Sequence, residues 1–414
     1  MNARYEPETQ FIGDRTDRSP LADLPELAGR HQPVLKVIGL GGGGCNAIER
    51  MMALGMRGVE FIAANTDVQA LKNNPAPTRI LLGPETTRGF GSGGDPAKGR
   101  AAAEESRREL AAALTGADMV FLTAGMGGGT GTGAIPVAAE IARSVGAVTI
   151  GVVTMPFAFE MGRRQKNARD GLDRLRAHTH TLVAIPNDRL LYVAPRNLPM
   201  ETAFRLADDV LRQAVQGIAE LITEPGLINV DFAHVRRLIL MGGGALLAIG
   251  HGEGEGKAAI ALEQALHHPL LDTVALDHAA GVIANFTGGS DLTLLEVQSA
   301  LMGLQAQTGP EVEIVLGVIN DERMDGRAQV ILMITGLGAP TLEEAFAAVR
   351  RPERAEPQAA SRPAAQPAPL PADAPAVVDA PAEPRRLTAA DAYQDRSLPA
   401  FFRYRGADGR RSSG

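Results

Sequence analysis

The sequence contains little cysteine, no tryptophan and no long apolar run. A single cysteine, Cys45, stands among 414 residues, which excludes an internal disulfide framework and is typical of a reducing compartment. No run reaches about 18 apolar residues, and the first residues hold no apolar segment like that of a signal peptide. We therefore expect a soluble cytoplasmic protein that does not insert into a membrane.

Positive charge is also scarcer than negative charge. Lys and Arg number 41 against 48 Asp and Glu, which gives a net charge of −7. No basic stripe follows the chain, so a nucleic-acid partner is not expected. The P-loop motif Gly-x-x-x-x-Gly-Lys-Ser/Thr is missing as well, which argues against a P-loop NTPase.

Glycine, by contrast, is abundant and gathers in loops. Residues 125–133 read Gly-Met-Gly-Gly-Gly-Thr-Gly-Thr-Gly between an apolar run at 117–122, predicted to be a strand, and a segment at 134–145, predicted to be a helix. Glycine lets the backbone approach an anion, and the free N–H groups at a helix start point toward it. The pattern predicts a phosphate cradle, to which the two threonine hydroxyls contribute.

An earlier glycine loop leaves two classes of protein open. Residues 39–46 contain a Gly-x-Gly-x-x-Gly pattern, and Asp67 follows 23 residues after Gly44, near the spacing of dinucleotide-binding folds. An NAD-dependent oxidoreductase therefore competes on this motif alone. Two loops that converge on one polyphosphate favour a nucleoside triphosphate instead.

A third glycine stretch, residues 89–96, has two equally good interpretations. Gly91 and Gly93 could let it cap a terminal phosphate with backbone N–H groups, or it could be a surface loop. It leads into a predicted amphipathic helix at 101–114.

Strands and helices alternate along the chain, which predicts a parallel sheet flanked by helices. Further strands are expected at 34–38, 61–64, 148–153 and 181–186, a helix at 46–54, and a long helix at 203–221. Strands at 282–286, 312–317 and 330–334 indicate a second sheet in a second α/β domain. Beyond 350 the composition turns to Pro, Ala, Glu and Arg, which cannot bury a core.

Taken in order, these motifs resemble the FtsZ family of bacterial cell-division proteins, the prokaryotic relatives of tubulin. The resemblance covers roughly residues 34–338 and the terminal peptide. It is carried by residues 41–46, 65–67, 127–133, 156–160 with Arg164, 185–188, 215–218 and 225–232.

The resemblance implies a fold and a division of the chain. The fold is α/β: a Rossmann-like parallel-sheet GTP-binding domain, a central helix, a second α/β domain and disordered termini. The implied boundaries are a disordered tail at 1–33, the GTP-binding domain at 34–202, the central helix at 203–224, the activation and polymerisation domain at 225–338, a helix end and linker at 339–390, and a docking peptide with a basic tail at 391–414. The glycine-rich residues 241–245 are interpreted as a loop.

The resemblance also implies a GTP site. Phe204 would stack on the base, and Asp208 would accept the N1 and N2 protons of guanine, which selects GTP over ATP. Glu160 and Arg164 match positions near the ribose and base, although they also suit a solvated ion pair at a helix start. The full set expected to bind GTP or GDP, with Mg²⁺, is Gly42, Gly43, Gly44, Cys45, Asn46, Gly91, Gly93, Gly128, Gly129, Thr130, Gly131, Thr132, Glu160, Arg164, Asn187, Phe204 and Asp208.

Hydrolysis depends on a different segment. In the family, subunits stack head to tail, and an Asn-x-Asp-x-x-Asp/Glu loop of the next subunit completes the site. Here the loop runs from Asn229 to His234. Its first acidic residue is present as Asp231, and His234 occupies the position of the second. A neutral imidazole can accept a proton but is not a carboxylate ligand for a cation, and a general acid–base group contributes about 10²–10⁴-fold. We expect GTP binding with weakened or lost hydrolysis. The protein would be either a filament-forming cell-division protein or a regulatory or structural paralogue.

An apolar cluster stands near the C-terminus. It is either chance hydrophobicity or a peptide that docks on a partner. The resemblance favours docking on membrane-tethering and division-regulating proteins at the division site, on the inner face of the membrane. The residues concerned are Leu398, Pro399, Phe401, Phe402 and Arg403.

Overall fold

The computed structural model describes residues 32–160, 162–191, 198–224, 226–228, 230–268, 271 and 279–337. The tails predicted at 1–33 and 339–414 fall almost wholly outside these residues, and the docking peptide does so entirely. No helix among the described residues combines the length and apolar character that a bilayer crossing requires.

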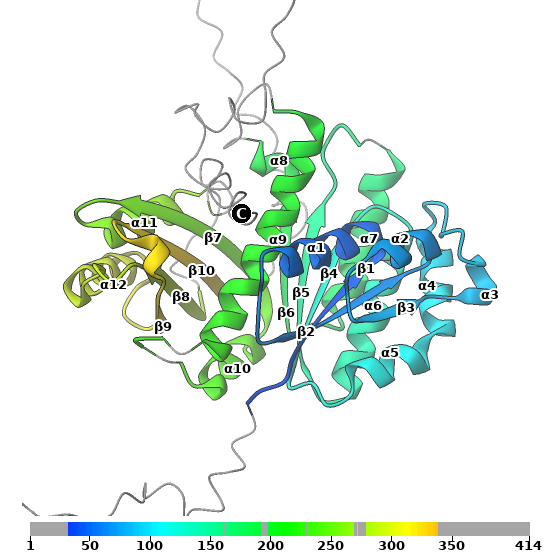
Figure 1. Ribbon diagram of the computed structural model, residues 1–414, viewed down its shortest axis with the longest axis horizontal. Helices are drawn as coiled ribbons and strands as arrows, with labels where there is room; N and C mark the ends of the chain where they lie inside the picture. Colours follow the sequence, from blue (N-terminus) through cyan, green and yellow to red (C-terminus); the bar gives the residue numbers. More distant parts are fainter. Residues whose placement is uncertain are drawn as a thin grey trace, which may run out of the picture.

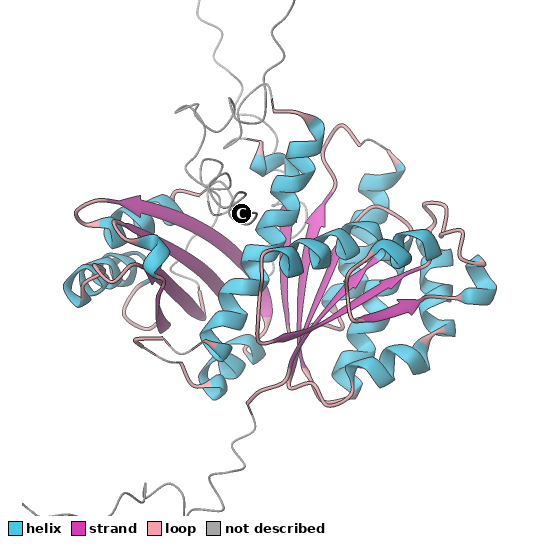
Figure 2. Ribbon diagram, in the orientation of Figure 1, coloured by secondary structure: helices cyan, strands magenta, loops and turns pink. Residues whose placement is uncertain are grey.

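One continuous sheet forms the centre of the molecule (Figure 2). Its strand order is β3-β2-β1-β4-β5-β6-β7-β10-β8-β9. The first six strands pair in parallel, in the order of a Rossmann fold, and each is followed by a helix or turn at its carboxyl end. Their bounds are β1 Leu35–Leu40, β2 Val59–Asn65, β3 Thr78–Leu81, β4 Met119–Gly125, β5 Val148–Met155 and β6 Thr181–Pro186.

Helices cover both faces of this parallel half, which is why the runs in β1, β4 and β5 are apolar and buried throughout. One face packs against α1 (Gly41–Ala53), α2 (Val68–Asn73), α9 (Met200–Thr223) and α10 (Phe232–Leu240). The other face packs against α4 (Pro96–Glu105), α5 (Arg107–Leu114), α6 (Thr130–Ser144) and α7 (Arg163–Arg176). Two one-turn helices, α3 (Pro84–Thr87) and α8 (Asn187–Leu190), complete this half.

The expectation of a second, separate sheet is wrong. Strand β7 (Gly243–Glu253) pairs in parallel with β6 through three positions, Thr181 to Val183, and so extends the first sheet. The remaining strands then run antiparallel around β10. The elements of this half are α11 Lys257–Leu266, β8 Gly281–Gly288, α12 Leu294–Thr308, β9 Glu313–Asn320, a 3-10 turn at Glu322–Met324 and β10 Arg327–Leu337.

The interpretation of residues 241–245 as a loop is wrong as well, because most of this segment belongs to a strand. Gly243 to Ala245 form the start of β7, and Gly250 and Gly252 lie further along it. A Cβ on Gly250 would lie 1.9 Å from the carbonyl oxygen of Ala261, and one on Gly252 would lie 2.0 Å from that of Lys257. These glycines let α11 pack closely on the strand, which the sequence pattern alone did not reveal.

The single helix predicted at 101–114 is two helices that break at Ser106. The Ser106 hydroxyl accepts a hydrogen bond from Gly83 N at 3.0 Å and donates to Leu81 O at 3.3 Å. The side chain thereby ties the break to the end of β3. The other predicted strands and the long helix at 203–221 are confirmed, with α9 longer by a few residues at each end.

Helix α9 contacts both halves of the molecule (Figure 1). Its buried side chains share one apolar core with α1 and β5 on one side and with β8 and β10 on the other. A helix of 24 residues spans about 36 Å. Its two ends therefore lie at opposite poles of the protein.

Candidate functional site

A cavity of about 400 Å³ opens at the carboxyl ends of the parallel strands. It lies where β1 and β4 are neighbours and the strand order reverses, which is the usual ligand position in an open α/β sheet. Its lining comes from the three glycine loops, the segment after β5 and the first turns of α9. The lining residues are Gly42, Gly43, Asn46, Ser92, Gly125, Met126, Gly128, Gly129, Thr130, Gly131, Thr154, Met155, Pro156, Glu160, Arg164, Asn187, Phe204, Ala207 and Asp208.

The first two glycine loops touch each other through their backbones. A Cβ on Gly41 would lie 2.7 Å from Gly131 N, and one on Gly43 would lie 3.0 Å from Gly125 N. Gly42 and Gly128, in contrast, have no neighbouring atom within 4 Å of a built Cβ and border open space. The loops therefore form two walls of one cavity, as the prediction that they converge requires.

Both cradle loops continue directly into helices. Helix α1 begins at Gly41 and α6 at Thr130, earlier than their apolar patterns indicated. Residues of both helix starts line the cavity, and because the first N–H groups of a helix have no intrahelical partner, they favour an anion there. Gly127, with φ +96°, donates its N–H to Thr132 Oγ1 at 2.8 Å, so Thr132 supports the loop from behind.

The third glycine loop turns sharply before α4. Its left-handed residues are Gly89, Gly91, Gly93 and Gly94, and Arg88 just before it is left-handed as well. The cavity wall contains none of these but does contain Ser92, which the sequence reasoning missed. Its position between Gly91 and Gly93 was the available signal, because those glycines had been predicted to approach a phosphate.

The opposite end of the cavity is lined by an aromatic ring, Phe204, and a buried amide, Asn187. Phe204 meets Phe157 edge-on with 5.4 Å between ring centroids, and Phe157 stacks on Phe159. Asn187 is buried, and its Oδ1 has no hydrogen-bond partner among the described residues. A buried oxygen of this kind fits a bound ligand that donates a hydrogen bond.

A carboxylate, Asp208, lines the same cavity one turn along α9 from Phe204. Its Oδ2 is 3.2 Å from Arg50 Nη1, and the same nitrogen donates to Arg205 O at 2.9 Å. Burial raises the pKa of Asp208 to about 6; Arg50 opposes this rise, and Asp209 adds to it. Arg50 thus fixes the orientation of the carboxylate and links α1 to α9.

Glu160 and Arg164 form an ion pair at the cavity rim. Arg164 Nε is 3.0 Å from Glu160 Oε2, and Glu160 Oε1 accepts a hydrogen bond from Phe157 N at 3.0 Å. Both residues line the cavity. The two residues can therefore form an ion pair and still border a ligand in the cavity.

Five residues of the expected GTP set lie outside the cavity lining. Gly44 lies against the next strand, where a Cβ would be 2.4 Å from Thr123 O. Cys45 is buried, and burial raises the pKa of its thiol to about 12, so it is not a nucleophile. The others are Gly91, Gly93 and Thr132.

Asp67, on which the dinucleotide alternative depends, has another role. Its Oδ1 accepts hydrogen bonds from Gln69 N at 2.8 Å and Ala70 N at 3.2 Å and so caps α2. It does not line the cavity. The carboxylate that would bind a ribose hydroxyl in a dinucleotide enzyme is therefore committed to a helix start.

Asp231 and His234 lie far from the cavity of their own chain. They stand at the start of α10, beyond the far end of α9 (Figure 1). Both are exposed, and Asp231 Oδ1 accepts from Ala233 N at 3.0 Å as the helix cap. Asn229 lies outside the described residues.

Comparison with known proteins defines the class. Residues 34–195 match the Tubulin/FtsZ family GTPase domain, and residues 243–338 match the FtsZ family C-terminal domain. Cell division protein FtsZ 1 of Thermococcus kodakarensis is 46% identical over 340 residues, covering 79% of this chain and 90% of that protein. FtsZ 1 of Archaeoglobus fulgidus is 48% identical over 309 residues, covering 75% and 83%.

Solved structures agree with this class. An empty FtsZ dimer of M. jannaschii superposes with a TM-score of 0.73 at 44% identity, covering 77% of this chain and 93% of that one. The protein is therefore a tubulin-like GTPase. The chain belongs to the FtsZ family of cell-division proteins.

Proposed function

We propose that the cavity binds GTP with its base at Asp208 and its phosphates in the glycine cradle. The observation that carries the proposal is the pairing of two touching glycine loops with a buried carboxylate at the far end of the same cavity. Guanine presents two neighbouring donors, N1–H and N2–H, which suit a carboxylate, whereas adenine presents an acceptor at N1. Asn187 Oδ1 offers a further acceptor, and Phe204 a ring surface.

Within this site the chain's own residues bind and orient. Gly42, Gly43 and Asn46 would hold the nucleotide from α1, and residues 128–131, from the loop before α6 and its first turn, would hold the phosphates. Glu160 and Arg164 would contact the ribose side. Bound Mg²⁺ would neutralise phosphate charge, and because it keeps several waters, phosphate oxygens can supply most of its other ligands.

We infer that the protein assembles head to tail. Asp231 and His234 are separated from their own cavity by the length of α9, so a second subunit must supply them. Exposed apolar side chains occur at both poles: Phe159 and Met200 at the cavity end, Leu227 and Met241 at the α10 end. Such patches suit burial between subunits.

In the proposed filament, Asp231 of one subunit faces the phosphates bound by the next. Its carboxylate orients or deprotonates the attacking water, while His234 offers an imidazole where an acid would add negative charge. We propose slow hydrolysis in a division-site filament on the cytoplasmic side of the membrane. A weakly hydrolysing paralogue that regulates or stabilises filaments is the second candidate, and His234 is the observation that favours it.

Three measurements test this function. Calorimetry is expected to detect binding of GTP and GDP but not of ATP or NAD. Light scattering should rise on addition of GTP, and phosphate release should be slower than from a relative with an acidic residue at this position. Failure to bind GTP would refute the whole assignment. Binding without a scattering rise would refute only the filament.

We also propose domain boundaries at 202 and 224 and the docking of residues 398–403 on membrane-tethering partners. Residues 398–403 lie outside the described part of the chain. Deletion of residues 391–414 should leave GTP binding and scattering unchanged while abolishing recruitment to a tethering partner.

A further inference from the structure

Three hydroxyl groups form a chain at one side of the cavity. Thr66 Oγ1 lies 2.6 Å from Thr130 Oγ1, which lies 3.0 Å from Ser92 Oγ. They come from the turn after β2, the first residue of α6 and the third glycine loop. All three residues are buried, Thr66 completely, and only Ser92 and Thr130 line the cavity.

Burial determines which way the first proton points. Among the described residues, Thr66 Oγ1 has one hydrogen-bond partner, Thr130 Oγ1. If Thr66 only accepted, its own O–H would be buried without an acceptor, which is costly. Thr66 therefore donates to Thr130.

Three protons and two links leave one proton without a partner inside the chain. When Thr130 in turn donates to Ser92, every hydroxyl except the last donates its proton to the next one in the chain. The remaining proton then belongs to Ser92, at the cavity wall. Successive hydrogen bonds polarise one another, so this last O–H is a strengthened donor.

The position of Ser92 relates it to the end of a bound nucleotide. Asp208 belongs to α9, on one face of the sheet, whereas the third loop leads into α4 on the other face. A nucleotide with its base at Asp208 would extend from α9 past the cradle toward this loop. The loop also packs tightly there, because a Cβ on Gly129 would lie 2.2 Å from Ser92 Oγ and 2.7 Å from Asp95 N.

We propose that Ser92 donates a hydrogen bond to the terminal phosphate of bound GTP and thereby makes the cavity prefer GTP over GDP. Thr66 and Thr130 are positioning residues that fix the direction of the Ser92 proton. This inference rests on the proposed GTP binding and adds to it a side chain that distinguishes the triphosphate from the diphosphate. A diphosphate would leave the Ser92 hydroxyl with water as its partner.

The test compares two ligands on the full chain. A fluorescent GDP analogue is competed off with GDP or with guanosine 5′-(β,γ-methylene)triphosphate, at protein concentrations too low for assembly. Ser92→Ala is expected to weaken triphosphate binding roughly 10- to 100-fold, the range for a hydrogen bond to a charged group, and to leave GDP binding unchanged. Equal loss for both ligands, or no loss for either, would overturn the inference.

Variants of Thr66 test the positioning role. Thr66→Val removes the donor at the start of the chain and should lower the triphosphate preference about 2- to 5-fold. Thr66→Ser keeps the hydroxyl and should keep the preference. Equal loss in both variants would indicate packing rather than proton direction and would contradict the proposal.

Thr87→Val is the matched control for the loop itself. Thr87 Oγ1 anchors the start of the same loop by donating to Gly83 O at 2.9 Å, but it does not line the cavity. The Thr87→Val variant should prefer the triphosphate as strongly as the unchanged protein does. A loss of preference as large as that of Ser92→Ala would contradict the inference. If the unchanged protein binds neither ligand, the proposed GTP binding itself fails. If the unchanged protein binds both ligands, and Ser92→Ala leaves the ratio of the two affinities unchanged, the inference alone fails.

Discussion

In the proposed site, the ionisation of Asp208 would couple base recognition to pH. Burial raises the pKa of this carboxyl to about 6 despite Arg50 beside it. Only the ionised carboxylate can accept both donors of guanine, so a proton competes with the base. The affinity for GDP should therefore fall as the pH drops below about 6, by about tenfold per pH unit in the limit.

The folding contribution of Asp208 has the opposite sign. Because its pKa is raised in the folded protein, the proton is held more tightly there than in the unfolded chain, and the residue's contribution to stability rises as the pH falls from above 6 toward 4. Lost affinity would thus not reflect unfolding caused by this group. Asp208→Asn is the control: its GDP affinity, weaker at pH 7.5, should retain only the pH dependence of the phosphates. Titration curves of equal steepness for both proteins between pH 5 and 7.5 would disprove the assignment.

His234 is the residue expected to limit turnover. Replacing it with aspartate restores the acidic group that the resemblance implies at this place in the loop. At protein concentrations above the assembly threshold, His234→Asp should raise the rate of phosphate release about 10- to 100-fold, within the range of a general acid–base group. His234→Asn, which is neutral and of similar size, should give no increase. A large loss of turnover in His234→Asn would instead show that the imidazole itself is used.

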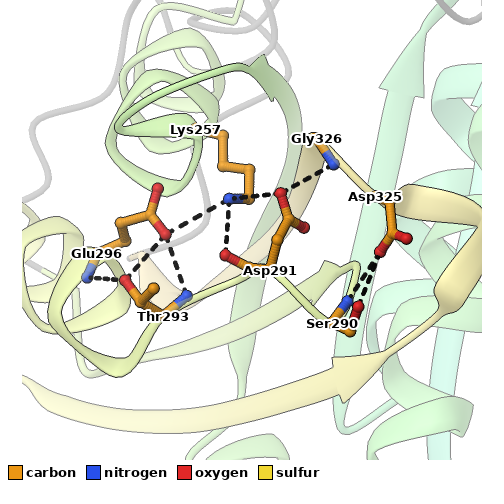
Figure 3. A network of polar contacts seen from close by, with 7 residues as sticks. All are labelled: Lys257, Ser290, Asp291, Thr293, Glu296, Asp325 and Gly326. Carbon is orange, nitrogen blue, oxygen red and sulfur yellow. Dashed lines mark hydrogen bonds and ion pairs between the residues drawn. The ribbon is translucent and has the colours of Figure 1, made fainter.

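At the scale of elements, one buried lysine joins three segments of the second half of the molecule (Figure 3). Lys257 Nζ, at the start of α11, lies 3.0 Å from Asp291 O, 3.2 Å from Asp291 Oδ2 and 3.5 Å from Glu296 Oε2. Asp291 also accepts from Gly326 N at 3.0 Å, so the turn before β10 joins the same network. The contacts hold α11, the start of α12 and β10 together.

Lys257→Met should lower the free energy of unfolding by about 1–3 kcal/mol, because the Asp291 carbonyl and the Glu296 carboxylate lose their buried donor. Chemical denaturation followed by circular dichroism measures the change. Lys72→Met, at an exposed lysine, should stay within about 0.5 kcal/mol. Nucleotide affinity should be unaffected in both variants, because neither lysine lines the cavity.

The elements also illustrate what the sequence could predict. The apolar runs of β1, β4 and β5 and the glycine loops after β1 and β4 were recognisable, because burial on both faces and backbone approach each leave a local signature. Strand β7 was missed because Gly250 and Gly252 serve the packing of α11, a contact set by distant residues. Ser92 was missed for a similar reason: its hydroxyl partner, Thr130, comes from another segment.

At the scale of the whole molecule, the two halves of the proposed hydrolytic site occupy opposite poles. Asp208 and the cradle lie at the amino end of α9, while Asp231 and His234 follow its carboxyl end. A single subunit therefore cannot close the site on itself. In the proposed assembly, the heterologous contact between opposite poles would repeat from subunit to subunit and give an open filament.

This arrangement predicts complementation between two inactive variants. Asp208→Ala should lack hydrolysis because its cavity no longer holds guanine, and Asp231→Ala because it gives nothing to its neighbour's cavity. In an equimolar mixture, an intact cavity of one variant meets an intact Asp231 of the other at about a quarter of the contacts, if copolymerisation is random. Phosphate release from the mixture should then reach up to roughly a quarter of the rate of the unchanged protein, provided that Asp208→Ala subunits still join filaments, which co-sedimentation with GTP measures. Co-sedimentation of both variants without any recovered turnover would contradict a site shared between subunits.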